Sequence, residues 1–138
     1  MSHLVVIASE GPLTFGLRRA LSYASFWSPD TGRDPMDSLI GIQHPSVVVL
    51  DLVTPPKPVL TMLDALITES KGKPILRRHT YLAIKPGLGL PGTLEERLKT
   101  GYDFEMVAAH EPFGSIVNHI HRLEMRLLEK PPASFMDS

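Results

Sequence analysis

The chain has 138 residues, of which 43% are hydrophobic and 21% are charged, and its formal net charge is −1. This composition is typical of one globular domain with a buried core, and it excludes the strongly basic or acidic surfaces of many nucleic-acid or membrane-surface proteins. The absence of cysteine excludes disulfides, thiol catalysis and cysteine-bound metal clusters, and we expect a cytoplasmic protein without a membrane-spanning segment.

The first half of the sequence predicts three strands and three helices. Residues 3–9 form a short apolar run, typical of a strand buried on both faces, and helically spaced apolar residues follow from Pro12. Residues 25–28 predict a weaker strand, and residues 36–43 predict a short amphipathic helix. Residues 46–53 form the strongest strand pattern, because four branched apolar residues precede Asp51. A helical stripe of apolar residues covers positions 59–67.

The second half predicts two further strands and two further helices. We expect a strand over residues 80–85, because Arg77, Arg78 and His79 are poor residues for a central strand and are interpreted as a solvated loop. A loop follows to residue 92, and then a short helix over residues 94–100. A strand over residues 104–109 precedes a long helix that begins at Pro112. We expect residues 1–130 to form the domain and residues 131–138 to form a C-terminal tail or the start of a linker.

Strands and helices therefore alternate along the whole chain. Right-handed crossovers then give a three-layer α/β/α fold with a five-stranded parallel sheet. The flavodoxin-like strand order 2-1-3-4-5 is the expected arrangement at this size, and its sites form at the carboxyl ends of the strands. Ser9, Glu10 and Asp51 follow or end two of these strands, so we expect them at one edge of the sheet.

Three segments together resemble the receiver domain of bacterial two-component response regulators. They are GPLTFGLRRAL, HPSVVVLDLVTPP and EPFGSIVNHIHRL, and the resemblance covers about residues 3–124. It places Asp51 on the phosphoacceptor position of that family. It implies a non-enzymatic signalling domain with protein partners, a histidine kinase as a possible partner, and homodimerisation.

The sequence departs from the receiver pattern at the residues that surround the phosphoacceptor. Ser9 and Glu10 stand where receivers carry two acidic residues that help to hold Mg²⁺. We expect at most weak Mg²⁺ binding through Glu10 and Asp51, because Mg²⁺ demands well-placed oxygen ligands. Glu111 stands where the family carries a lysine that pairs with the phosphoryl group. A carboxylate there repels phosphate by about 4 kcal/mol for each unit of charge at roughly 4 Å and a surface-like dielectric, before salt screening.

Two further residues are candidates for replacing the missing groups. Lys85 would end the fourth strand and could offer Asp51 the positive charge that position 111 lacks. The alternative interpretation of Lys85 is a solvated residue before Pro86. Thr80 could supply the hydroxyl that receivers place at the end of this strand, but only if the strand began earlier than residue 80.

The long final helix carries an apolar stripe at Ile116, Ile120, Leu123 and Leu127. This stripe is interpreted either as the face that packs against the sheet or as a candidate interface with a second copy.

Our leading hypothesis is a divergent receiver-like (pseudo-receiver) domain that acts through protein–protein interaction and is not switched by ordinary aspartyl phosphorylation. The alternatives are a phosphorylatable response regulator that uses Asp51, and a small flavodoxin-like enzyme or ligand-binding domain. A general acid–base pair drawn from Asp51, Glu10 and Glu111 lacks a nucleophile, which disfavours the enzyme.

Overall fold

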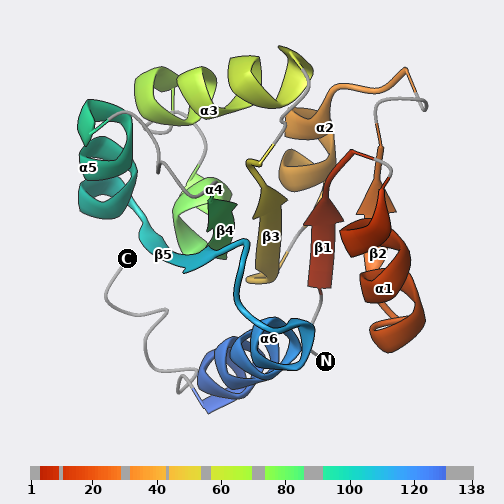
Figure 1. Ribbon diagram of the computed structural model, residues 1–138. Coiled ribbons are helices and arrows are strands. Elements are labelled where there is room, and N and C mark those ends of the chain that lie inside the picture. Colours follow the sequence, from red (N-terminus) through yellow and green to blue (C-terminus); the bar gives the residue numbers. More distant parts are fainter. Residues whose placement is uncertain are drawn as a thin grey trace.

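Five strands form one parallel sheet in the computed structural model, with the order β2-β1-β3-β4-β5 (Figure 1). The structure describes residues 4–9, 11–28, 32–42, 44–53, 57–69, 74–85 and 92–129. The strands are β1 (Leu4–Ile7), β2 (Ser25–Trp27), β3 (Val47–Asp51), β4 (Thr80–Lys85) and β5 (Asp103–Ala108). All neighbouring pairs are parallel, which confirms the predicted fold class and strand order.

The helices are α1 (Pro12–Ala20), α2 (Pro35–Ile40), α3 (Lys57–Glu69), α4 (Pro74–Arg78), α5 (Gly92–Gly101) and α6 (Phe113–Glu129). Proline occupies the first turn of α1 and α2, where its missing N–H breaks no helical hydrogen bond. Among the described helices, none is long and apolar enough to cross a membrane. The predicted tail at residues 131–138 lies outside the described residues.

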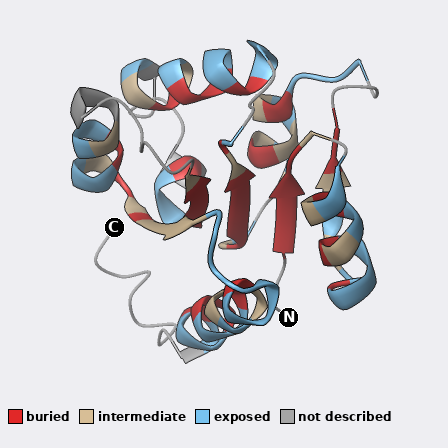
Figure 2. Ribbon diagram, viewed as in Figure 1, coloured by how far each residue is buried: buried red, intermediate tan, exposed pale blue. Residues whose placement is uncertain are grey.

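Strand alternation divides the core into two layers. Val47 and Val49 of β3 belong to the cluster that packs against α1 and α6, whereas Val48 and Leu50 belong to the cluster that packs against α2, α3, α4 and α5. Consecutive side chains of a strand point to opposite faces, so a strand covered on both sides must be apolar at every position. Figure 2 accordingly shows the central strands as buried along their length.

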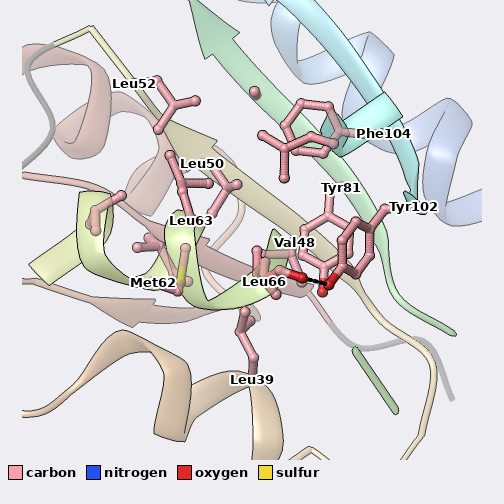
Figure 3. Packing of buried hydrophobic residues seen from close by; sticks show 14 of the residues in the cluster. Leu39, Val48, Leu50, Leu52, Met62, Leu63, Leu66, Tyr81, Tyr102 and Phe104 are labelled. Atoms are coloured by element: carbon pink, nitrogen blue, oxygen red, sulfur yellow. Dashed lines mark hydrogen bonds between the residues drawn. The ribbon is translucent and has the colours of Figure 1, made fainter. Parts of the chain in front are cut away.

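Two tyrosines anchor the helices that cover the second face. Tyr81 on β4 donates to the carbonyl oxygen of Leu76 at 2.7 Å, and Tyr102, just before β5, donates to the carbonyl oxygen of Leu66. The two rings meet edge to face with their centroids 5.4 Å apart, as Figure 3 shows beside the leucines of the cluster. Each ring thus adds apolar area to the core while its hydroxyl fixes a nearby backbone segment.

The segment before β4 differs from the prediction. Residues 74–78 form the short helix α4, so Arg77 and Arg78 belong to a helix and not to the predicted loop, although both are exposed as predicted. His79 is fully buried. The Ser46 N–H donates to His79 Nδ1 at 3.1 Å, and His79 Nε2 lies 3.2 Å from the Leu39 carbonyl oxygen. The ring therefore joins the end of α2, the approach to β3 and the start of β4.

Candidate functional site

Asp51 is the last residue of β3 and lies at the carboxyl edge of the sheet. The register pairs it with Ile84 of β4, which in turn pairs with Val107 of β5. The apolar run that precedes it is fully buried, whereas Asp51 itself is only partly buried. An ionised carboxylate is costly to bury, so the strand reaches the surface at the residue where its charge appears.

The surroundings of Asp51 disfavour its negative charge. Burial raises the pKa of the carboxyl above its ordinary value, and the Val53 N–H, which donates to Oδ1 at 3.1 Å, lowers it in part. Among the described residues, no ion pair involves Asp51. The hydrogen bond to Val53 also matches the alternative interpretation of Asp51 as a turn residue that binds a following amide.

Ser9 and Glu10 are the residues that the sequence places beside Asp51. The Ser9 carbonyl oxygen accepts a hydrogen bond from the buried Thr14 hydroxyl at 2.5 Å, which ties the end of β1 to the first turn of α1. Glu10 lies outside the described residues, so its role in holding a metal stays a prediction. The residues that are described contain no group of three or more His, Cys, Asp or Glu side chains that could hold a metal ion. Of the two predicted Mg²⁺ ligands, the described residues supply only Asp51. Mg²⁺ is usually held by one or two carboxylates together with waters, so weak Mg²⁺ binding stays a prediction.

Lys85 ends β4, as predicted, but strand alternation directs it away from Asp51. Ile84 packs in the cluster beneath α1 and α6, and Ala83 packs in the opposite cluster. Asp51 follows Val49 toward the first of these faces, whereas Lys85 follows Ala83 toward the second. Within the described part of the chain, no ion pair joins the two side chains.

Thr80 lies at the amino end of β4, whereas Asp51 lies at the carboxyl end of β3. It begins β4 and pairs with Val47, the first residue of β3. Its buried hydroxyl donates to Asp103 Oδ2 at 2.8 Å. Thr80 could have supplied the hydroxyl only if β4 began before residue 80, so that Thr80 stood near the carboxyl end of the strand. The structure has β4 beginning at residue 80, so this condition is not met. Thr80 is therefore not a neighbour of Asp51.

Glu111 lies in the turn between β5 and α6. Its N–H donates to the Ala108 carbonyl oxygen at 3.1 Å, and its side chain is exposed. The turn is held close to α1, because the Phe113 ring packs over Gly16: a Cβ at Gly16 would lie 2.9 Å from that ring. The sequence thus puts a carboxylate, and not a cation, on the turn that follows β5.

The candidate interface on α6 is a core face. Ile116, Ile120, Leu123 and Leu127 are buried against the sheet, with 2%, 0%, 2% and 9% of their surface exposed. This corrects their assignment to an interface, because the helix repeat directs them toward the strands. The exposed apolar residues in the second half of α6 are Met125 and Leu128, at 57% and 56%.

A charged cluster on β5 and α6 was not predicted. Arg126 contacts Asp103 at 2.9 Å and Glu105 at 2.7 Å, and His119 Nε2 lies 2.9 Å from Glu105 Oε1. Burial raises the pKa of Glu105, but the hydrogen bonds from His119 and Arg126 lower it more, so the net shift is downward. The signal in the sequence is the alternation of acidic residues around Phe104, opposite basic residues seven apart on the helix.

Comparison with known proteins supports the fold alone. No protein-family model matches the chain, and no curated protein matches it by sequence. Among solved structures, a CheY-like response regulator receiver domain protein from Methanospirillum hungatei JF-1 superposes with a TM-score of 0.66 at 12% identity, covering 94% of this chain and 98% of the other.

Two further solved structures also superpose on most of this chain. The beryllofluoride-activated NtrC4 receiver domain dimer gives a TM-score of 0.59 at 18% identity, covering 92% of this chain and 99% of that one. An adenylate cyclase structure from Rhodopirellula baltica gives 0.61 at 15% identity, covering 92% and 90%. The strand order, the covered faces and these superpositions together show that the chain has the fold of a CheY-like receiver domain.

Proposed function

We propose that the chain is a receiver-like signalling domain that acts through protein–protein contact and is not switched by ordinary phosphorylation of Asp51. The observation that carries this proposal is the setting of Asp51. Its carboxyl pKa is raised by burial and lowered only in part by a backbone N–H. A phosphoacceptor site needs positive charge, because an acyl phosphate carries close to two negative charges.

The described neighbours supply no such charge to Asp51. Lys85 leaves β4 on the opposite face, and Glu111 adds a second carboxylate to the same edge of the sheet. Oriented cations and hydrogen-bond donors are what stabilise a transferring phosphoryl group in proteins. In the described part of the chain, the edge keeps the position of a receiver site but places no cation beside Asp51, which supports the proposal.

Beryllofluoride binding tests this proposal. Beryllofluoride is a tetrahedral anion that occupies the place of a phosphoryl group on an aspartate. We expect no slowly exchanging bound signal in ¹⁹F NMR when the wild-type chain is mixed with beryllium, fluoride and Mg²⁺. A bound signal that disappears in Asp51→Asn would instead favour the phosphorylatable response regulator.

Variants at Glu111 separate charge from shape. Glu111→Lys supplies the cation that the family resemblance implies, and the matched control Glu111→Gln only removes the repulsion. If missing charge is the obstacle, Glu111→Lys should bind beryllofluoride more strongly than Glu111→Gln. If neither variant binds, the shape of the edge is also unsuited to a phosphoryl group, and the proposal holds for a second reason.

We also propose a homodimer, with its contact moved from the buried stripe of α6 to the exposed residues Met125 and Leu128. They lie three positions apart and therefore share one side of the helix. The NtrC4 receiver domain was solved as a dimer, which supports the proposal by likeness of fold.

A further inference from the structure

A hollow of about 310 Å³ lies between the edge strand β2 and helix α2, away from Asp51. Val5, Trp27 and Ile42 give it apolar walls, and Asp37 and Ser38 add polar groups from α2. The indole of Trp27 is fixed, because its Nε1–H donates to the Arg33 carbonyl oxygen at 2.9 Å and only 4% of the residue is exposed. The wall of the hollow that Trp27 forms is therefore held in place before any ligand binds.

All three residues of β2 line the hollow, and β2 is an edge of the sheet. The Ala8 N–H donates to the Trp27 carbonyl oxygen, so the backbone groups of Trp27 point toward β1. Backbone N–H and C=O directions alternate along a strand, so those of Phe26 point away from β1. An occupant of the hollow would thus lie beside a backbone N–H and C=O that no other strand of the described sheet pairs with.

The opposite edge of the sheet is differently equipped. On β5, Asp103 and Glu105 are tied to Arg126 and His119 of α6. Charged side chains on an edge strand oppose the addition of another strand. The three residues of β2 are Ser25, Phe26 and Trp27, none of which is charged. Strand β5 therefore carries charged side chains that oppose strand pairing, and strand β2 carries none.

We propose that the β2 edge and its hollow bind an extended peptide segment of a protein partner. The peptide pairs with the outward backbone groups of Phe26 and places an apolar side chain against Trp27 and Ile42. Main-chain pairing combined with a side-chain pocket is a recurrent mode of peptide recognition. Because β2 is only three residues long, few backbone hydrogen bonds can form along it. The peptide side chain that enters the hollow therefore decides which peptides bind.

Gly41 allows the hollow to be filled selectively. It follows α2 with φ −70°, an ordinary right-handed value, and a Cβ there would meet only the Asp37 carbonyl oxygen, at 3.2 Å. Gly41 lines the hollow and its φ suits any residue, but the 3.2 Å contact is tight, so Gly41→Leu requires a shift of a few tenths of an ångström at the end of α2. Gly101→Leu is the matched control, because a Cβ at the end of α5 meets nothing within 4 Å. Ser38→Phe is a second blocking variant if Gly41→Leu does not fold.

A random heptapeptide display library is selected on the wild-type chain. The enriched peptide is then titrated by fluorescence of Trp27, the single tryptophan. We expect Gly41→Leu to weaken binding at least tenfold and Gly101→Leu to change it less than twofold. N-methylation of alternate peptide amides should also weaken binding at least tenfold.

Failure to enrich any peptide would overturn the proposal, and so would enriched peptides that all bind Gly41→Leu as tightly as the wild-type chain. A peptide that tolerates N-methylation at every position would overturn the strand pairing, because only a pocket for a side chain or a small molecule would remain. Neither result depends on Asp51, so the outcome is independent of the proposed signalling function.

Discussion

Replacement of His79 by phenylalanine tests the buried histidine directly. The phenylalanine ring is somewhat larger than the imidazole and removes two hydrogen-bonding nitrogens, so any overpacking at this buried position adds to the loss of stability. The Ser46 N–H and the Leu39 carbonyl oxygen then lose the partners that lie at 3.1 and 3.2 Å. A buried backbone group without a partner costs about 1–3 kcal/mol, so the two together predict a loss of about 2–6 kcal/mol. This is a large share of the 5–15 kcal/mol that is typical of a domain.

Urea denaturation measures this loss through the fluorescence of Trp27, which is nearly fully buried. The matched control is His121→Phe, because the His121 side chain is 49% exposed, and a change at such a position usually stays within about 0.5 kcal/mol. If the free energy of unfolding of His79→Phe also stayed within about 0.5 kcal/mol of the wild-type value, the account of His79 as a structural link would be wrong.

Three further predictions concern charge and assembly. Burial raises the pKa of Asp51 in the folded state above its value in the unfolded state. Ionisation of Asp51 therefore destabilises the fold fully above the folded-state pKa, and this destabilisation disappears below the unfolded-state pKa. Asp51→Asn, which keeps an oxygen for the Val53 N–H, should therefore raise the free energy of unfolding at pH 7. Thermal melts between pH 3 and about pH 7 should show the gain fade toward acid; an equal gain at every pH would contradict it. Arg126→Met should destabilise by about 1 kcal/mol at low salt, because three partly exposed charges lose their contacts. The loss should shrink in about 1 M NaCl, and below the lowered pKa of Glu105, where that carboxylate is neutral; a loss unchanged by salt would indicate packing instead. Met125→Lys with Leu128→Lys should convert a dimer to a monomer in light scattering, and a wild-type monomer at high concentration would refute the dimer.

The sheet could be predicted because its pattern is local. Each strand is a short apolar run, and the alternation of strands with helices leaves few topologies once crossovers are right-handed. The position of Asp51 followed from the same pattern, because a charged residue after a buried run must stand where the strand reaches the surface. These features depend on neighbours in the sequence, so sequence reasoning reached them.

The side-chain contacts could not be predicted because they join distant segments. His79 was interpreted as a loop residue from its basic neighbours, yet its partners lie 33 and 40 positions away in the chain. Lys85 was placed at the correct strand end, but its direction relative to Asp51 depends on the register between β3 and β4. The stripe on α6 was correctly identified as apolar, and only packing decided that it faces the sheet.

The most direct measurement is the intact mass of the chain after incubation with acetyl phosphate and Mg²⁺. Acetyl phosphate donates its phosphoryl group without a kinase, so the result depends on the chain alone. We predict that the mass stays unchanged, because Asp51 has no cation among its described neighbours and shares its edge of the sheet with Glu111. Stoichiometric addition of one phosphoryl group, lost in Asp51→Asn, would contradict this account and identify a working response regulator.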